Sequence, residues 1–364
     1  GGKRAEFWAK ELHKHNYYPI IITRIWNENQ TNLTDEILSN ELQIEKNDKS
    51  EVHRLPVKRT LRMKMENYNS SSILKKIVTF FEIIVSSFKF SNSIHYNFFE
   101  YTNDILTKNP DLQLLIVSGR PFESFQIAYH LKKENPKLKW LADYRDEWTT
   151  FQNKDSLPFA NKVTNLFHDF FERKWTSNCE AIITVSKNWL KSIQKIIHKP
   201  GYVIMNGFDN TAKNIPLKSE INSPLTISYI GSMYPNQHIE ILTETLRKNH
   251  ILNNIKLLFI GINFIPGQKK RVEDLTKGLN IEIIDRIPSK ELEKYIEKTD
   301  VFYLTGFEGL KGWYPVKIFD YLIWNRTIVL CPSDNDVLEE IIKNTESGFA
   351  VSNSEELQNL LHKL

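Results

Sequence analysis

The sequence predicts an α/β protein with two doubly wound, Rossmann-like domains. Apolar, β-rich runs alternate with longer helical patterns along almost the whole chain, which is typical of parallel sheets covered by helices on both faces. The length of 364 residues exceeds what one compact core usually holds. A stretch rich in Asn, Pro, Ser and Gly, residues 205–225, separates two such alternations, so we place the domains at residues 1–208 and 209–364.

Eleven apolar runs account for the predicted strands, each bounded by turn-forming or polar residues. Those of the first domain are YPIIIT, EVHRLPV, LQLLIVS, LKWLAD, AIITVS and GYVIMN. Those of the second are LTISYIG, IKLLFIG, IEIID, VFYLTG and TIVLCP. The chain opens with GGKRAEFWAKELHKH, a glycine pair that leads directly into an amphipathic helix. Since a strand normally feeds such a helix, we expect a first strand before Gly1, the alternative being that the glycines are a cloning remnant.

Composition favours a cytoplasmic protein. Hydrophobic residues make up 41% and charged residues 25% of the chain, and only two cysteines occur, which makes a disulfide framework improbable. Neither a signal peptide nor an apolar run of about 18 residues is evident. The charge is uneven: 30 Lys and Arg against 23 Asp and Glu through Phe208, an excess of seven, and 18 against 21 afterwards. The first half therefore favours anionic partners.

One insert, residues 53–90, interrupts the alternation. It holds eight Lys and Arg but two Glu, and it includes the run ILKKIVTFFEIIVSSFKF. Lys75 and Lys76 beside aromatic and aliphatic residues suit an amphipathic helix at an anionic membrane surface. A helix packed on its own domain with a solvated basic edge explains the same pattern, and both interpretations stay open.

The segment DYRDEW follows a predicted strand that we expect to end near Ala142. Ligands of open α/β sheets bind beyond the carboxyl ends of the strands, so Asp143, Arg145 and Asp146 are candidate site residues. Their carboxylates suit sugar hydroxyls, and the guanidinium suits a phosphate. The alternative is a local ion pair with Trp148 as a hydrophobic plug.

Other sequence patterns do not indicate a functional site. The stretch SDND, residues 333–336, imitates a metal-binding motif, but Ser333 or Asp334 is better explained as a helix N-cap. The ten histidines lack zinc spacing, so we expect no metal and no other cofactor. HLKKENPKLK lacks the interleaved aromatic residues of a nucleic-acid surface, so no nucleic-acid partner is expected.

Seven segments in order resemble the GT-B glycosyltransferases of the family-four type, and together they cover nearly the whole chain. They are GGKRAEFWAKEL, SGRPFESFQIAYHLKK, DYRDEW, ITVSKNWLKSI, MNGFDN, ISYIGSMY and KIFDYLIWNRTIVL. The resemblance implies two domains that face each other across a cleft. It also implies transfer of a sugar from a nucleotide diphosphate to an acceptor, with retention at the anomeric carbon and without a bound catalytic metal.

The resemblance also assigns donor-binding roles. Gly1 and Gly2 would let the backbone approach the diphosphate, with Arg4 adding a charge-assisted bond. Asp320 would accept hydrogen bonds from the ribose hydroxyls, with Lys317 near the phosphates one turn earlier. Backbone atoms near Arg286 and Ile287 would face the base.

Two departures from the family pattern affect these roles. The usual first glutamate falls at Gly312, so Glu308 would have to serve through a shifted loop. The usual arginine and lysine pair is not evident in GSMYPNQH. Phosphate binding would then fall to Lys311, Lys317, Arg4 or the amides of Gly231 and Ser232.

The resemblance places DYRDEW at the reaction centre. Arg145 would stabilise phosphate charge and Asp146 would position the acceptor hydroxyl or the donor sugar, while Asp143 is the one of the three that could be structural. We therefore expect a cytoplasmic transferase for surface polysaccharide or glycolipid synthesis, with a carbohydrate or lipid-linked acceptor and peripheral membrane contact through residues 53–90. A nucleotide-sugar epimerase and a catalytically silent subunit of a polysaccharide assembly complex are the alternatives.

Overall fold

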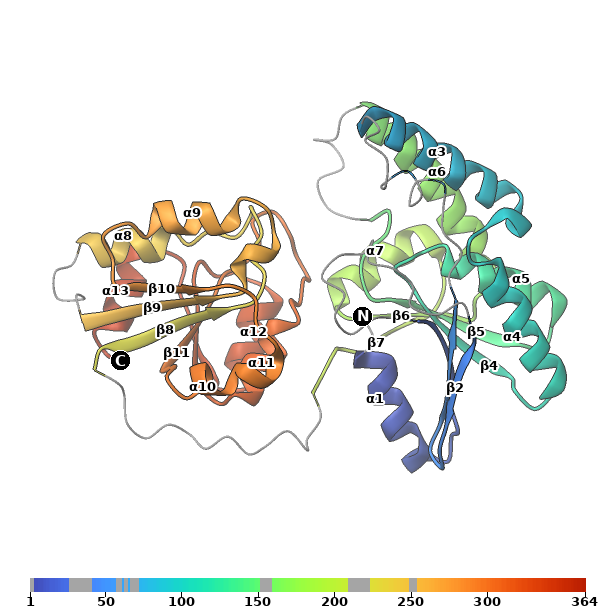
Figure 1. Ribbon diagram of the computed structural model, residues 1–364, viewed down its shortest axis with the longest axis horizontal. Helices are drawn as coiled ribbons and strands as arrows, with labels where there is room; N and C mark the ends of the chain where they lie inside the picture. The colour runs from blue at the N-terminus through green and yellow to red at the C-terminus, as the bar shows by residue number, and fades with distance from the viewer. Residues whose placement is uncertain are drawn as a thin grey trace. The chain divides into compact units, whose positions relative to one another are not determined.

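The computed structural model describes residues 3–25, 41–56, 61, 65, 72–150, 159–208, 223–248 and 254–364. The chain forms two compact units (Figure 1). Unit 1 is Gly1–Val185 with Trp189–Ile204, and unit 2 is Ser186–Asn188 with Met205–Leu364. Much of the expected join at residues 205–225 lies outside the described residues.

Unit 2 holds a six-stranded sheet in which every neighbouring pair is parallel. Its strands are β8 (Leu225–Ile230), β9 (Ile255–Ile260), β10 (Ile281–Ile284), β11 (Val301–Leu304), β12 (Thr327–Leu330) and β13 (Gly348–Ala350). The order is β10-β9-β8-β11-β12-β13, so the winding reverses between β8 and β11. This is the doubly wound topology that the sequence predicted.

Helices cover both faces of that sheet (Figure 1). One face packs against α8 (Glu240–Lys248), α9 (Gln268–Leu275) and α13 (Ser354–Leu361). The other packs against α10 (Glu293–Ile296), α11 (Lys317–Ile323) and α12 (Val337–Asn344). All six residues of β8 are buried as a result, including the polar Thr226 and Ser228, so the polar positions of LTISYI do not mark a solvent-exposed face. The short helices η5 (Ile262–Phe264) and η6 (Ser289–Glu291) complete the unit.

Unit 1 is built around a parallel four-stranded sheet in the order β4-β5-β6-β7. These strands are Leu114–Ser118, Lys139–Tyr144, Ala181–Thr184 and Gly201–Val203. The helices of this part are α3 (Ser72–Phe88), η2 (Phe90–Asn92), α4 (Tyr96–Lys108), α5 (Ser124–Glu134), α6 (Phe159–Thr176) and α7 (Lys187–Ile197). Trp140, Ala142 and Phe125 are fully buried between α5 and the sheet.

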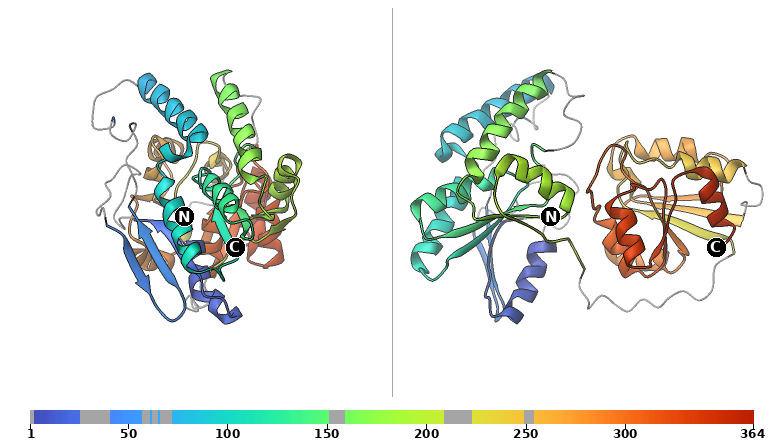
Figure 2. Two further views of the ribbon diagram at one scale, coloured as in Figure 1. Left: turned by 90° about the vertical axis from the view of Figure 1, so that its right-hand side faces the viewer. Right: turned by 180° about the vertical axis from the view of Figure 1, so that it is seen from behind.

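A second, three-stranded sheet stands beside it in unit 1, in the order β1-β3-β2 (Figure 2). Strands β1 (Ile20–Arg24) and β3 (Glu51–Leu55) are parallel, whereas β2 (Gln43–Lys46) is antiparallel to β3. Helix α1 (Lys3–Glu11) contacts β1 and continues into η1 (Leu12–His15). Among the described strands, β1 and β4 are edge strands of their sheets.

All eleven predicted strands are confirmed, and two short strands were missed. Strand β2 has a single apolar residue, Ile44, and all four of its residues are exposed, so no burial pattern marks it. Its hairpin depends instead on the Asn47 side chain, which accepts hydrogen bonds from the N–H groups of Lys49 and Ser50. Strand β13 is three residues long. The expectation of parallel strands throughout the first domain is therefore wrong at β2.

The loop after β5 is fastened to α6 by a buried carboxyl group. Thr149 donates a hydrogen bond from its hydroxyl to the side chain of Glu172, which is fully buried. Burial raises the pKa of Glu172 from 4.5 to about 7. The folded protein therefore keeps a proton that the unfolded chain releases between these values, and the free energy of unfolding decreases as the pH rises through this window.

Glu172→Gln should remove this pH dependence. We expect the variant to gain about 2 to 3 kcal/mol relative to the wild type between about pH 4.5 and pH 8, because the wild type must ionise a buried group over that range. Urea denaturation followed by tryptophan fluorescence at the two pH values measures the difference. An equal difference at both pH values would contradict a protonated Glu172.

Candidate functional site

The strand order of unit 2 defines where a ligand can bind. In a doubly wound sheet the connections on either side of the reversal leave in opposite directions, and the crevice opens beyond the carboxyl ends of those two strands. Here the reversal lies between β8 and β11. Gly231 and Ser232 follow β8, and Lys317 begins α11, the helix that follows β11. The structure brings these three residues into contact.

Lys317 places a cation in a desolvated position at this edge. Its Nζ donates a hydrogen bond to the carbonyl oxygen of Ser232 at 2.8 Å and another to the Tyr229 hydroxyl. The same ammonium lies 3.9 Å from the centre of the Tyr229 ring. Burial lowers the pKa of Lys317 from 10.5 to about 7, since these partners do not fully replace water around the charge.

Two glycines leave room beside that ammonium. Gly231 has φ of 109°, and a Cβ there would lie 3.8 Å from Lys317 Nζ. Its N–H donates to the carbonyl of Ile260 at 2.8 Å, so Gly231 offers space rather than a hydrogen-bond donor. Gly261 after β9 has φ of 80°, and its Cβ would come within 3.7 Å of Gly231 Cα. We did not single out Gly261 from the sequence, although FIG after β9 repeats the YIG after β8.

Tyr321 fixes this arrangement by joining α11 to β8. The Ile230 N–H donates to the Tyr321 hydroxyl at 2.8 Å, and the hydroxyl donates to the Ile230 carbonyl at 3.3 Å. The Tyr321 side chain is fully buried and its ring stacks on Phe302 of β11. The start of α11, and with it Lys317, is therefore held against the end of β8.

The other predicted donor-binding residues of unit 2 lie along the same edge of the fold. Asp320 is half-buried in the first turn of α11. After β10, the Arg286 N–H donates to the Asn263 side chain at 2.9 Å, and the Arg286 guanidinium lies 4.8 Å from the centre of the Phe264 ring. Phe264 is exposed, which makes it a candidate that the sequence gave us no reason to select. Ile287 packs against the core.

Glu308 and Lys311 each contact residues other than Lys317. Glu308 is 73% exposed and approaches His238 Nε2 at 2.9 Å. Lys311 donates to the carbonyl oxygen of Asp334. The Asp334 carboxylate in turn accepts hydrogen bonds from the N–H groups of Leu338 and Glu339, so its side chain caps the start of α12. The N-cap position itself is Asp336, whereas the sequence predicted Ser333 or Asp334.

In unit 1, Asp143 is an internal ion-pair residue. It is fully buried, accepts a hydrogen bond from the Ser118 hydroxyl at 2.6 Å and lies 3.2 Å from the Arg4 guanidinium. Desolvation raises the pKa of Asp143, and Arg4 opposes that shift. Arg4 also donates to the carbonyl of Ile204 at 3.1 Å, so its side chain joins α1 to the ends of β5 and β7. Strand β5 runs on to Tyr144, past the expected end at Ala142.

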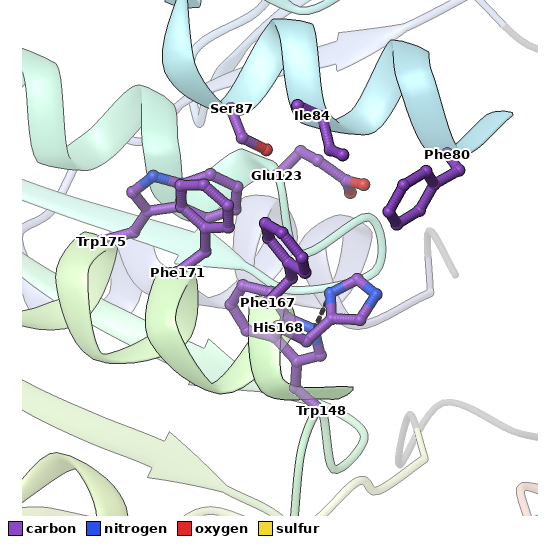
Figure 3. A pocket seen from close by; sticks show the side chains of 9 residues that line it. All are labelled: Phe80, Ile84, Ser87, Glu123, Trp148, Phe167, His168, Phe171 and Trp175. Atoms are coloured by element: carbon purple, nitrogen blue, oxygen red, sulfur yellow. Dashed lines mark hydrogen bonds between the residues drawn. The ribbon is translucent and has the colours of Figure 1, made fainter. Parts of the chain in front are cut away.

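Arg145 and Asp146 follow β5 and are half-buried. The Asp146 carboxylate lies 3.7 Å from Arg120, which comes from the loop after β4 and is 66% exposed. Arg120 is a further candidate that the same argument about strand ends could have found. Trp148 stacks on Phe122 at 4.9 Å and donates to His168 at 3.1 Å. Figure 3 shows the contact with His168. These contacts fit the alternative interpretation of Trp148 as a hydrophobic plug.

Some residues that the sequence singled out lie outside the described part of the chain. Gly2 is outside the described residues, and so are the side chains of Lys75 and Lys76. Within the described ranges, no cluster of three His, Cys, Asp or Glu is placed to hold a metal ion. No helix in the described part of the chain is long and apolar enough to cross a bilayer.

Comparison with known proteins shows the fold. No family model and no curated sequence matches the chain. Sucrose-phosphate synthase from Thermosynechococcus elongatus superposes with a TM-score of 0.62 at 12% identity, covering 99% of this chain and 82% of that one. Trehalose-6-phosphate synthase OtsA gives 0.58 at 11% identity, covering 100% and 86%. A glycosyltransferase from Rickettsia africae gives 0.55 at 15% identity, covering 98% and 82%.

These likenesses identify the class of fold. The chain has the α/β architecture of the GT-B glycosyltransferases, with a parallel sheet of four strands in unit 1 and of six in unit 2. At 11 to 15% identity they carry no information on substrate.

The desolvated lysine should destabilise unit 2 near neutral pH. Between pH 7 and 10.5 the unfolded chain holds a proton that folded Lys317 releases, so the free energy of unfolding rises with pH across this window. Lys317→Met should therefore melt a few degrees higher than the wild type near neutral pH, an advantage that shrinks toward about pH 9.5. Differential scanning calorimetry at both pH values tests this, with exposed Lys343→Met as the control. A constant difference would contradict the lowered pKa.

Proposed function

We propose that the protein is a glycosyltransferase that moves a sugar from a nucleoside-diphosphate donor to an acceptor hydroxyl. The observation that carries the proposal is the Lys317 ammonium, held in a desolvated position at the reversal point of the unit 2 sheet. A cation that is poorly compensated by its own protein is compensated when an anion binds beside it. The GT-B fold supplies the class of chemistry.

In the donor complex we assign the diphosphate to Lys317. Gly231 and Gly261 leave the space that phosphate oxygens would occupy, and Ser232 lies at the end of β8 where its amide could add a hydrogen bond. Asp320, three residues after Lys317 in α11, would accept hydrogen bonds from the ribose hydroxyls.

The base would lie at the end of β10. The backbone of Arg286 and Ile287 would face it, and the exposed Phe264 ring, which the Arg286 guanidinium covers, provides an aromatic surface there. Glu308 and Lys311 are proposed to contact the donor sugar and phosphates through movement of the loop that carries them. Arg4 takes no part in this proposal, because its guanidinium is enclosed beside Asp143 and donates to the Ile204 carbonyl.

The proposed transfer needs no enzymic base. The bond between the anomeric carbon and the phosphate oxygen breaks with its electron pair on the departing diphosphate. The acceptor oxygen bonds to the same face of the anomeric carbon, with retention, and its proton passes to the departing phosphate oxygen. Arg145 would stabilise the charge on that phosphate, and Asp146 would orient the acceptor hydroxyl, while buried Asp143 holds the loop. The reaction as written uses no metal and no other cofactor.

The acceptor is proposed to be a carbohydrate or a lipid-linked sugar in surface polysaccharide or glycolipid synthesis on the cytoplasmic side of a membrane. The positive excess of residues 1–208 supports an anionic acceptor or surface. The amphipathic helix in residues 53–90, described as α3, supports contact with lipid.

Donor binding is testable with a thermal-shift screen of UDP, GDP, TDP, CMP and their sugars. We expect one nucleotide to raise the melting temperature of the wild type by a few degrees at about 100 times its Kd. Lys317→Met and Asp320→Ala should lose that shift, whereas Lys343→Met should keep it. Because the bound state requires a protonated Lys317, affinity should fall by up to about tenfold per pH unit above pH 7. A pH-independent affinity that survives Lys317→Met would refute this site.

Transfer should separate from binding in unit 1 variants. Asp146→Ala should leave the nucleotide shift unchanged and lower sugar transfer by roughly a hundredfold, because Asp146 is proposed to orient the acceptor hydroxyl and not to contact the diphosphate. Donor turnover to an isomer without acceptor would instead identify an epimerase. Tight nucleotide binding without turnover, together with a stable protein partner, would identify a silent assembly subunit.

A further inference from the structure

Helices α3 and α6 of unit 1 lie side by side and project from the rest of the unit (Figure 1 and Figure 2). They meet through aromatic rings: Phe80 with Phe167 at 6.0 Å and Phe88 with Phe171 at 5.6 Å. Figure 3 shows Phe80, Phe167 and Phe171 around a small pocket that Trp148 also lines. Because residue numbers rise together along both contacts, the two helices run in the same direction.

These two helices expose mainly apolar side chains, whereas an ordinary surface helix exposes polar ones. The most exposed side chains described on α3 are all apolar, and on α6 the same holds except for Arg173. They include Phe81 at 59%, Phe88 at 65% and Leu166 at 69% exposed. We call this set the α3–α6 face. Its members are Leu74, Ile77, Phe81, Val85, Phe88, Leu166 and Phe170.

Helix geometry puts both parts of this set on one side. Each residue advances an α-helix by about 100°. On α3, the exposed Phe81 comes one position after Phe80, which contacts α6, and the exposed Phe88 itself contacts α6. On α6, the exposed Leu166 and Phe170 each come one position before a residue that contacts α3, Phe167 or Phe171. For two helices that run in the same direction, a step forward on one and a step back on the other turn toward the same side. The described members of the α3–α6 face therefore lie on the same side of the helix pair.

The charges described on these helices are distributed in favour of cations. Lys174 Nζ lies 5.9 Å and 5.8 Å from the ring centres of Phe170 and Phe171, so its ammonium borders the face, and Arg173 is exposed beside it. Among the acids described on these helices, Glu172 is fully buried, Asp169 is half-buried, and Glu82 is half-buried and accepts a hydrogen bond from the Leu61 N–H. The exposed charge described on α3 and α6 is thus positive.

We propose that the α3–α6 face docks on an anionic lipid bilayer. The face is a projecting ridge of large apolar side chains bordered by cations, and a bilayer accepts such a ridge without a matching groove while its headgroups pair with the cations. A second copy of the chain is the alternative occupant, and the oligomeric state measured below tests it. The sequence located this contact in residues 53–90, and the structure adds α6 to it.

Docking of the α3–α6 face would bring a bilayer close to the loop of unit 1 that carries Arg145 and Asp146. The functional meaning of this contact rests on the proposed function. Trp148 lines the pocket between α3 and α6, and it lies two residues after Asp146. A bilayer against the α3–α6 face would therefore lie against the helix pair that contacts this loop through Trp148. Nucleotide binding by unit 2 does not depend on the face, so the two proposals can fail separately.

The test compares two double variants of the full chain that make the same chemical change. Ile77→Ser with Phe81→Ser removes apolar area from the face, whereas Ile44→Ser with Phe349→Ser removes it from similarly exposed positions elsewhere. Wild type and control should sediment with phosphatidylcholine vesicles containing about one third phosphatidylglycerol, and the face variant should partition roughly tenfold or more weakly. Lys174→Glu should weaken binding to these vesicles more than to pure phosphatidylcholine, and Lys343→Glu should have little effect.

Two controls accompany the sedimentation measurements. Unchanged melting temperatures and unchanged nucleotide shifts establish that the variants are folded. Equal sedimentation of wild type and the Ile77→Ser, Phe81→Ser variant, or no sedimentation of the wild type, overturns the proposal. A wild-type dimer that the face variant converts to a monomer in light scattering also overturns it, in favour of a second copy as the occupant.

Discussion

Both units depend on the same constraint, which is that a parallel strand covered on both faces has no side on which to expose polar groups. Strand β8 is buried along its whole length, and its polar residues are satisfied internally: the Thr226 N–H donates to Asp300, and Ser228 shares a hydrogen bond with Thr299. Polar chemistry that is open to a ligand is consequently displaced to the ends of the strands. The candidate residues of unit 2 gather beyond β8, β9 and β10 for this reason.

Lys317 lowers the free energy of unfolding of unit 2 near neutral pH. A cation needs water or a counter-ion, yet this ammonium is packed against Tyr229 and the Ser232 carbonyl, which lowers its pKa to about 7. The tyrosine that ties α11 to β8 prevents the helix from moving to relieve it. Groups left undercompensated in this way are typical of binding sites, because the ligand supplies the missing interaction.

Unit 1 divides its charged residues between structure and surface. Asp143 is enclosed and paired with Arg4, so it connects α1 to the sheet, while Asp146 remains partly exposed near Arg120. Buried Glu172 then anchors the following loop through Thr149. The loop that carries Arg145 and Asp146 is therefore held at both ends, which suits residues that must keep one orientation. Beside it, the apolar α3–α6 face leaves hydrophobic area uncovered, and that area needs a partner outside the described residues.

The sequence by itself determined eleven of the thirteen described strands and the sheet edges at which candidate residues follow them. Runs such as LTISYIG and IKLLFIG are long, apolar and β-branched, so burial and propensity agree, and the positions after them were predictable as candidate site residues. It did not reveal β2, whose stability comes from hairpin contacts rather than from burial, or Gly261, Phe264 and Arg120. Tertiary structure alone decided that Lys317 is desolvated, that Asp143 is enclosed and that α3 turns its apolar residues outward. Each depends on partners far away in the chain, such as Tyr229 with Lys317, Arg4 with Asp143 and Phe80 with Phe167, and a local pattern contains no record of such distances.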